Sequence, residues 1–407
     1  MSFQQGLSGL NASSKSLEVI GNNVANASTV GFKQSFAQFS DVYANSLMGS
    51  GASQVGIGVN LAAVTQQFTQ GNITGTNNSL DISINGAGFF RMSNGGEITY
   101  TRNGQFQLDK SGYITDAQGK RLTGYLADDA GILDKGSPQD LQINYTDLVP
   151  SATAEVETKV NLDSREDTLT NAGFDPDDPT TYHNSTAITV YDSLGNGHTA
   201  QNFYVKTAAN TWSVFVTVNG DATYTGTTPN GTLTFPSTGT GIDPTSTMST
   251  ISYTPTTGAA ALAIDIDLTN STQFGSSFSV NTNNQDGYAS GRLASFNTSA
   301  DGTIVGSYTN GQSKNLGQLV LANFVNMNGL KPLGGNAWAE SSESGAPLVG
   351  EPSTGQLGAL QSSSVEDSNV DLTAELVNMI TAQRIYQANA QTIKTQDQVM
   401  QTLVNLR

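Results

Sequence analysis

The residues best able to do chemistry are two histidines and a group of aspartates in the middle of the chain. His183 and His198 are the only histidines, and cysteine is absent. A metal site needs three or four ligands with supporting hydrogen bonds, and no HExxH or similar spacing includes either histidine. Asp175, Asp177 and Asp178 resemble the start of a calcium loop, but the glycine at its sixth position and the glutamate at its twelfth are missing. We therefore expect a polar turn here and no metal.

Other signatures of catalysis are also missing from the sequence. GxSxG elbows, P-loops and GxGxxG fingerprints do not occur, and Gly56-Ile57-Gly58 lacks the third glycine. The absence of cysteine removes disulfides, thiolate metal sites and cysteine nucleophiles. Paired carboxylates of a glycosidase depend on their separation in space, which the sequence leaves open. The sequence predicts neither an enzyme nor a cofactor.

Composition narrows the classes of partner. The 407 residues have room for two to four domains, and only 13% of them are charged, against about 25% in ordinary domains. The net charge of −17 repels phosphate backbones and anionic lipid, which disfavours nucleic-acid and membrane binding. No run approaches the ~18 apolar residues of a transmembrane helix. The first twenty residues also lack the basic and apolar regions of a cleavable signal peptide.

The two ends of the chain have the pattern of amphipathic helices. If the protein acts through a binding surface and not a catalytic site, these helices are the elements that would carry it. Apolar residues recur every seven positions near the N-terminus. Ser368 and Asp371 resemble a capping box before residues 371–407, a stretch without glycine or proline. The apolar rows, a candidate assembly interface, are Phe3, Leu7, Leu10, Leu17, Ile20 and Val24 at one end and Leu372, Leu376, Met379, Tyr386, Ile393, Met400 and Val404 at the other.

The charge of the C-terminal helix bears on what these rows contact. Residues 371–407 include only three acidic and three basic side chains. One interpretation is a pair of helices packed on the protein's own body. The other is a coiled coil, in which the two ends pair antiparallel as a stalk. Soluble coiled coils usually carry Glu and Lys beside their apolar seam, so the scarcity of charge favours a stalk that packs against other copies.

Between the helices the pattern changes to short strands. Turn dipeptides such as Asn85-Gly86 and Asn103-Gly104 separate runs typical of hairpins, and a similar block follows near residues 291–338, with LGQLVLANF as its longest strand. We expect these halves to form one β domain around an insertion that is acidic and rich in threonine. The limits we expect are a helical assembly domain at 1–28 and 371–407, a connector at 29–75 and 348–370, a β domain at 76–148 and 286–347, and an inserted outer β domain at 149–285.

Three segments resemble one known family. Residues 7–33, LSGLNASSKSLEVIGNNVANASTVGFK, resemble the N-terminal signature of bacterial flagellar rod and hook proteins, and residues 368–407 resemble their C-terminal signature. LDISINGAGFFRM and the hairpins after it resemble the β domain that these proteins share. The fold class expected is therefore multidomain, with terminal α-helices forming an antiparallel coiled-coil stalk and two mainly β domains, the second inserted in the first. The connector anchors expected are Gly31, Phe32, Phe36 and Phe39.

The length and single insertion resemble the hook subunits of that family rather than the shorter rod subunits. The resemblance implies export through the flagellar type III pathway without a cleaved signal peptide, and self-assembly outside the cell into a curved, flexible tube. That tube acts as a universal joint transmitting torque from rod to filament. Its implied partners are other copies, a rod protein, a hook-associated junction protein, the hook cap and the export apparatus. The alternatives are a secreted β-rich adhesin, another rod-type subunit and, more remotely, a carbohydrate-active enzyme.

Overall fold

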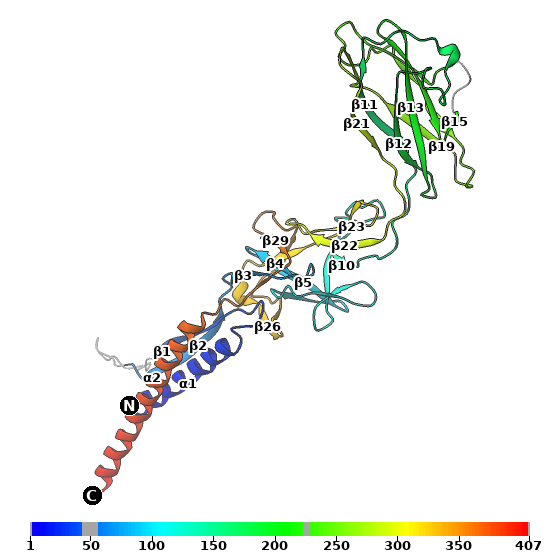
Figure 1. The fold of residues 1–407 in the computed structure, drawn as a ribbon. Coiled ribbons are helices and arrows are strands. Elements are labelled where there is room, and N and C mark those ends of the chain that lie inside the picture. Colours follow the sequence, from blue (N-terminus) through cyan, green and yellow to red (C-terminus); the bar gives the residue numbers. More distant parts are fainter. Residues whose placement is uncertain (1, 43–55, 223–227, 406–407) are drawn as a thin grey trace. The chain divides into compact units, whose positions relative to one another are not determined.

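The computed structural model describes residues 2–42, 56–222 and 228–405. The chain divides into two compact units (Figure 1). The first comprises Met1–Asn144, Phe296–Gly306 and Lys314–Arg407, and the second comprises Tyr145–Ser295 and Ser307–Ser313. The first unit holds the two long helices and a β body. In the described residues of the second unit, the regular elements are β-strands and one short turn of 3₁₀-helix, η1 (Asn171–Gly173).

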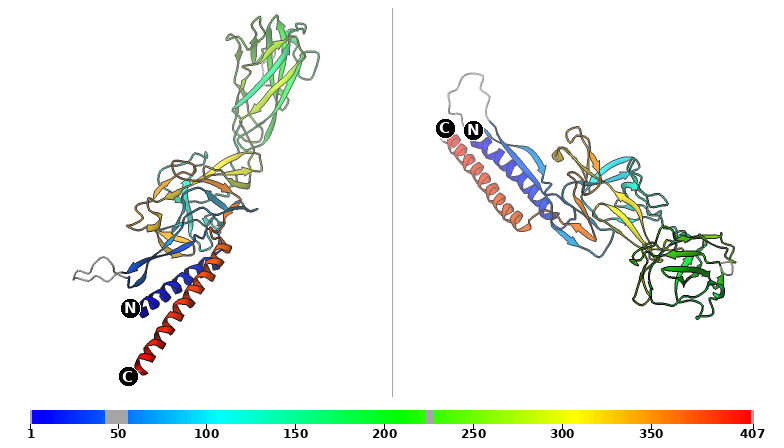
Figure 2. Two further views of the ribbon diagram at one scale, coloured as in Figure 1. Left: turned by 90° about the vertical axis from the view of Figure 1, so that its left-hand side faces the viewer. Right: turned by 90° about the horizontal axis from the view of Figure 1, so that it is seen from above.

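The two long helices lie at the ends of the chain, as expected. They are α1 (Ser2–Ala25) and α2 (Leu372–Asn405). Asp371 is the N-cap of α2, since its Oδ1 accepts the N–H groups of Thr373 (2.9 Å) and Ala374 (3.1 Å). The helices lie side by side and antiparallel, with both chain ends at the same end of the stalk (Figures 1 and 2). The predicted antiparallel pair is therefore confirmed.

Small residues of α1 form much of the contact with α2. A Cβ on Gly6 would lie 3.1 Å from Cγ1 of Ile393, and one on Gly9 would lie 2.8 Å from the amide nitrogen of Asn389. Ser13 is buried further along the same face. Because these residues carry little or no side chain, the two helix backbones approach closely. The contact thus differs from a seam of large apolar residues.

A β-hairpin, β1 (Ser35–Val42) and β2 (Gly58–Gln66), packs against α1. Gln5 donates to the carbonyl of Gly56 (2.6 Å), and the hydroxyl of Ser8 accepts the N–H of Val59 (3.3 Å). The antiparallel register shifts between Gln38 and Phe39. The described part of this hairpin thus belongs to the stalk rather than to the β body.

The first half of the β body contains the hairpins that the sequence predicts. Strands β5 and β6 pair antiparallel, as do β7 with β8 and β8 with β9. The bounds are β3 (Ile73–Gly75), β4 (Ile82–Asn85), β5 (Phe89–Asn94), β6 (Glu97–Thr101), β7 (Gln107–Leu108), β8 (Ile114–Thr115), β9 (Arg121–Leu126) and β10 (Gln139–Asp140).

The second half of the β body consists of the strands that follow the insertion. These are β22 (Leu293–Thr298), β23 (Thr303–Tyr308), β24 (Ser313–Leu319), β25 (Leu321–Asn323), β26 (Lys331–Gly334), β27 (Ala337–Ala339), β28 (Leu348–Gly350), β29 (Ala359–Ser362) and β30 (Ser364–Glu366), with a 3₁₀ turn, η2 (Met327–Gly329). Pairing of β24 with β9, β25 with β5, β27 with β6 and β29 with β4 joins the two halves. The prediction of one β domain built from both halves is therefore confirmed.

One strand prediction was wrong. The run LGQLVLANF forms two strands, β24 and β25, separated at Val320, and not one long strand. The two strands have different neighbours, because β24 pairs with β9 whereas β25 pairs with β5 and β28. The core beside it is aromatic, and Phe89, Tyr100, Phe324 and Trp338 pack edge to face.

A five-residue loop of the pattern D-x-x-G-x closes hairpins repeatedly. Asp109 shows the geometry, because its Oδ1 accepts the N–H groups of Ser111 (2.7 Å) and Tyr113 (2.9 Å). Gly112, the fourth residue, has a φ of 83°, which favours glycine. The same bonds recur at Asp116, Asp128 and Asp192.

The second unit consists of two packed sheets. Strands β12, β13, β14, β16 and β17 form one, with β15 beside β14, and β18, β19, β11 and β20 form the other, with β21 beside β11. The bounds are β11 (Glu155–Asp163), β12 (Asn184–Tyr191), β13 (Gly197–Ala208), β14 (Thr211–Val218), β15 (Asp221–Ala222), β16 (Gly231–Thr234), β17 (Thr247–Met248), β18 (Ile251–Tyr253), β19 (Leu262–Asp267), β20 (Thr272–Phe274) and β21 (Ser279–Gln285). Val160, Tyr204, Trp212 and Ile264 lie in the core between the sheets.

Candidate assembly surface

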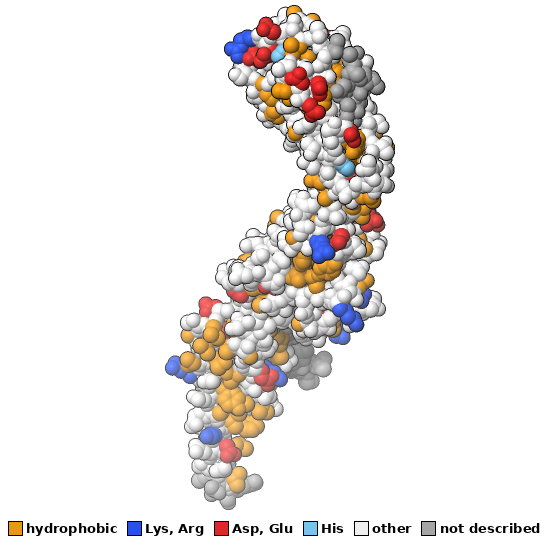
Figure 3. Space-filling model, turned by 45° about the vertical axis from the view of Figure 1, so that its right-hand side comes forward, with side chains coloured by type: hydrophobic (Ala, Val, Ile, Leu, Met, Phe, Trp, Pro, Cys, Tyr) orange, Lys and Arg blue, Asp and Glu red, His pale blue; other side chains and the backbone are white. Residues whose placement is uncertain are grey.

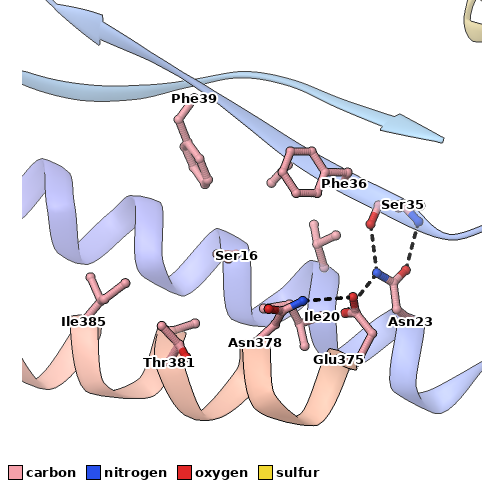
Figure 4. A pocket seen from close by; sticks show the side chains of 13 residues that line it. Ser16, Ile20, Asn23, Ser35, Phe36, Phe39, Glu375, Asn378, Thr381 and Ile385 are labelled. Carbon is pink, nitrogen blue, oxygen red and sulfur yellow. Dashed lines mark hydrogen bonds between the residues drawn. The ribbon is translucent and has the colours of Figure 1, made fainter. Parts of the chain in front are cut away.

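The stalk has an open groove where α1, α2 and β1 meet (Figure 4). Its volume is about 270 Å³. Phe36 and Phe39 point from β1 toward the helices, Ile20 comes from α1, and Ala382 and Ile385 come from α2. Phe36 is 56% exposed and Phe39 is 40% exposed. The groove therefore presents aromatic and aliphatic surface to the outside.

One end of the groove is polar, and its polar groups are already paired. Glu375, in the first turn of α2, is buried, and its carboxylate accepts from Asn23 (3.3 Å) and Gln34 (2.8 Å). Asn23 also donates to the carbonyl of Ser35 (2.8 Å) and accepts from its N–H (2.9 Å). The N-terminal end of a helix stabilises a negative charge there. No other side chain lining the groove is charged.

Residues of the predicted N-terminal row lie at different depths. Ile20 is buried, whereas Leu10, Leu17 and Val24 are partly buried. Phe3 and Leu7, nearer the free end of the helix, are about half exposed. The row therefore contributes to the contact with α2 and leaves apolar surface outside it.

The predicted C-terminal row divides in the same way. Met379 and Ile393 are partly buried, and Ile393 contacts the face of α1 that carries Gly6. Leu372, Leu376, Tyr386, Met400 and Val404 are exposed. Further exposed apolar residues on α2, which the sequence analysis did not select, are Val377, Ile380, Ile385 and Val399. Figure 3 shows hydrophobic side chains gathered along the stalk.

A buried ionic cluster lies where the stalk joins the β body. Glu366 accepts from Lys33 Nζ (2.6 Å) through Oε1 and from Arg102 Nη1 (3.0 Å) through Oε2, and all three side chains are buried. Lys33 also donates to the carbonyl of Thr69 (2.8 Å), and the N–H of Gly71 donates to Glu366 (2.9 Å). The cluster thus connects both connector segments to the body.

Burial is the largest influence on the pKa values of the two cations in this cluster. Burial lowers the pKa of Lys33, and the nearby Glu366 carboxylate opposes that shift. Burial likewise lowers the pKa of Arg102 against the same carboxylate. Arg102 gains a further bond to the carbonyl of Gly86 (2.8 Å) and lies 5.5 Å from the ring centroid of Phe89. One carboxylate therefore balances two cations away from water.

The predicted connector anchors occupy two places. Gly31 lies beside the ionic cluster with a φ of 71°, and a Cβ there would lie 2.6 Å from the backbone nitrogen of Asn103. Its N–H donates to the backbone carbonyl of Glu366 (2.8 Å). Phe32 is partly buried next to it. Phe36 and Phe39 instead line the groove, so they face the helices rather than the body.

The two histidines use both ring nitrogens within the second unit. His183 Nδ1 accepts the N–H of Lys206 (3.2 Å), and its Nε2 contacts the carbonyl of Asp167 (2.8 Å). His198 lies between Asn219 (2.7 Å) and Asp192 (3.1 Å). Both rings are therefore already hydrogen-bonded on each side.

The aspartates that resemble a calcium loop form a turn. Asp175 accepts the N–H of Asp177 (3.0 Å), and Asp178 accepts the N–H of Thr180 (2.9 Å). Within the described ranges, no three His, Asp or Glu side chains are grouped so that they could hold a metal ion. The described helices also include none long and apolar enough to span a bilayer.

Sequence reasoning missed several residues of the stalk. Gly6, Gly9 and Ser13 lie on the face of α1 that meets α2. Gly6, Ser13 and Ile20 also form a seven-residue row of small and apolar residues. That row could have been recognised. No local sequence pattern predicts that Lys33, Arg102 and Glu366 form one cluster, because these residues are far apart in the sequence.

Comparison with known proteins identifies the family. Four family models match successive segments: Flagella basal body rod protein at 3–33, Flagellar hook protein FlgE/F/G D1 domain at 83–166, Flagellar basal body protein FlaE D2 domain at 161–288, and Flagellar basal body rod FlgEFG protein C-terminal at 361–406. The flagellar hook protein FlgE of Salmonella typhimurium is 42% identical over 100% of both chains. The chain belongs to the FlgE family of flagellar hook proteins.

Other relatives agree with this assignment. FlgE of Escherichia coli is 41% identical over the full length of both chains, and FlgE of Borreliella burgdorferi is 32% identical over 100% of this chain and 99% of that one. The crystal structure of Helicobacter pylori flagellar hook protein FlgE2 superposes with a TM-score of 0.53, covering 71% of this chain and 99% of that chain at 14% identity. The last comparison supports the fold alone. The resemblance found in the sequence is thus confirmed, and the family is structural rather than enzymatic.

Proposed function

We propose that this chain is the structural subunit of the bacterial flagellar hook and that it self-assembles into a curved, flexible tube. The tube acts as a universal joint that transmits torque from the rod to the filament. The observation that carries the proposal is the stalk, whose exposed apolar side chains are interspersed with few charges. A contiguous apolar surface of this kind is typical of a protein interface.

The radial arrangement of the tube follows from where each surface lies in the chain. The domain limits stay as predicted from the sequence: 1–28 and 371–407, 29–75 with 348–370, 76–148 with 286–347, and 149–285. The predicted interface rows and the groove form the inner, tightly packed layer. The acidic, threonine-rich insertion lies at the outer radius, where polar contacts with bridging water are easily exchanged as the tube bends.

We propose specific partners for this tube. The tube joins a flagellar rod protein at its proximal end and a hook-associated junction protein at its distal end. The hook cap and the flagellar export apparatus act during assembly, and the chain leaves the cell without a cleaved signal peptide. The net charge of −17 argues against nucleic acid or anionic membrane as a further partner.

A secreted β-rich adhesin remains the alternative class. Such a module binds a foreign surface and has no need of an apolar stalk at its chain ends. The experiment that separates the two is polymerisation of the purified protein in ammonium sulfate, followed by negative-stain electron microscopy. Tubes support the hook proposal. A protein that stays monomeric under all salting-out conditions contradicts it.

Truncation tests the role of the stalk in the same assay. Deleting 1–28 or 371–407 leaves the strands of both β units intact, so we expect a folded, soluble chain that forms no tubes. Circular dichroism checks the fold of the truncated chains. Normal tubes from either truncation contradict the assignment of the assembly surface.

A further inference from the structure

The two helices of the stalk differ in length, and α2 extends past the end of α1. Gly6 faces Ile393, and the helices run antiparallel, so Ser2 reaches about as far as Asp397. The residues of α2 from Gln398 to Asn405 therefore have no α1 beside them in the described chain. At 1.5 Å per residue this overhang is about 12 Å long. Figure 1 and the left view of Figure 2 show it.

The overhang is uncharged and carries apolar side chains on one face. Met400 and Val404 lie four residues apart, so they share one face of the helix. Met400 is 54% exposed, Val404 is 71% exposed, and Val399 beside them is also exposed. No charged residue occurs between Gln398 and Asn405. A helix end of this kind gains stability when its apolar face is covered.

The groove matches the overhang in chemistry and in length. Its walls are Phe36, Phe39 and Ile385, and its one charge, on Glu375, is buried and hydrogen-bonded. The α1 side runs from Ser16 to Asn23, which is about 12 Å. The volume of about 270 Å³ is small beside the ~300–1,000 Å³ of small-molecule pockets, and it suits a few side chains.

The overhang of one chain cannot fill the groove of the same chain. Met400 lies fifteen residues beyond Ile385 on a straight helix, or about 22 Å away. Two complementary surfaces at different places on one molecule make a head-to-tail contact, which builds a ring if the rotation closes and an open helical polymer if it does not. Because no described residue of the chain covers either surface, a second copy is the occupant that suits both.

We propose that the α2 overhang of one subunit docks into the groove between α1, α2 and β1 of a second subunit. Met400 and Val404 insert between Phe36, Phe39 and Ile385. This contact rests on the proposed self-assembly and assigns to it a specific pair of surfaces. It also explains why α2 is longer than α1 and why an open groove with aromatic and aliphatic side chains faces outward.

Cysteine crosslinking tests the contact directly, because the native chain has no cysteine. The test chain carries Phe39→Cys and Met400→Cys. A disulfide needs Cα atoms within about 7 Å, so these two positions of one chain cannot bridge. Polymer of this chain, oxidised and run on a non-reducing gel, should give a ladder of dimers, trimers and longer species. The matched control carries Phe39→Cys and Thr395→Cys.

The control places its thiol on a different face of the same helix. Thr395 is exposed and precedes Met400 by five residues, or about 140° around the helix axis. We expect no ladder from the control. Chains with only one of these cysteines can form disulfides only between the same position of two subunits, so they show how much of a ladder comes from such contacts. Tubes without a ladder from the test chain, or equal ladders from test and control, overturn the inference while self-assembly stands. A wild-type protein that forms no tubes contradicts the proposed function instead.

A second measurement decides the matter if the cysteine chain does not assemble. Met400→Gln should raise the protein concentration needed for tube formation at least tenfold, because it removes the central apolar side chain of the contact. Thr395→Gln should leave that concentration unchanged. An unaltered threshold with Met400→Gln overturns the docking contact.

Discussion

At the scale of single residues, the most consequential group is the carboxylate of Glu366. It is buried with two cations, Lys33 and Arg102, and receives a bond from each. Removing one partner of a buried ion pair leaves charge without compensation, whereas exposed pairs contribute little. The exposed pair Lys15 and Glu18 provides the comparison within the same chain.

We expect Glu366→Gln to destabilise the first unit by about 3–5 kcal/mol, because two buried cations lose their counterion. Urea unfolding followed by the fluorescence of Trp338, in the Trp212→Phe background, measures this. The control, Glu18→Gln, should change the free energy of unfolding by less than about 0.5 kcal/mol. A loss below about 1 kcal/mol for Glu366→Gln contradicts a central role for the cluster.

Asp192 is a buried carboxylate that we expect to contribute to the acid stability of the second unit. Burial opposes its charge, but hydrogen bonds from Asn196, His198 and two backbone N–H groups outweigh burial and hold its pKa below the ordinary value. A carboxylate with a depressed pKa stabilises the fold fully above its unfolded pKa of about 3.9, and this stabilisation is lost as the pH falls further.

The second unit should therefore lose stability between about pH 4 and pH 2, and Asp192→Asn should lessen that loss. Urea midpoints reported by Trp212, in the Trp338→Phe background, measure it. Asp177→Asn, which changes an exposed carboxylate in the same unit, should keep the wild-type slope. Equal slopes in wild type and Asp192→Asn would show that other groups set the acid response.

At the scale of elements, the stalk depends on close approach of α1 and α2. A Cβ on Gly9 would lie 2.8 Å from the side-chain amide nitrogen of Asn389, so a larger side chain at this position must displace that amide. Gly21, in the same helix, has nothing within 4 Å of an added Cβ. The two glycines thus offer the same substitution in a crowded and an open setting.

Gly9→Leu should separate the helices and reduce the helical signal of the monomer, whereas Gly21→Leu should raise helix stability by roughly 0.5–1 kcal/mol through better helix propensity. Circular dichroism at 222 nm during thermal unfolding compares them. If both variants behave alike, the helices do not pair in the free subunit and their contact forms only on assembly.

At the scale of the whole molecule, the inserted segment of residues 149–290 begins and ends at neighbouring positions within the second unit. Leu148 and Gly291 exchange backbone hydrogen bonds (2.7 and 3.3 Å), and Ser151 does the same with Tyr288 (3.0 and 3.0 Å). A short linker can therefore join residues 148 and 291 at little entropic cost. The helices and the groove remain in the shortened chain.

We expect a chain with residues 149–290 replaced by Gly-Gly to assemble into tubes of altered curvature, because the proposed outer contacts are lost and the stalk is kept. Electron microscopy of hooks from cells that carry only this variant measures the curvature. Wild-type curvature contradicts an outer position for the insertion, and the absence of tubes shows that the insertion takes part in assembly.

The sequence by itself determined the terminal helices, the hairpins of the β body and the family. Seven-residue periodicity and the Asp371 cap specify the terminal helices, and turn dipeptides specify the hairpins, because these are local properties of the chain. Only the tertiary structure decided which surfaces meet. The Gly6 contact with Ile393, the groove under Phe36 and Phe39, and the cluster around Glu366 join residues hundreds of positions apart. Such contacts depend on how the elements pack, and no local pattern records that packing.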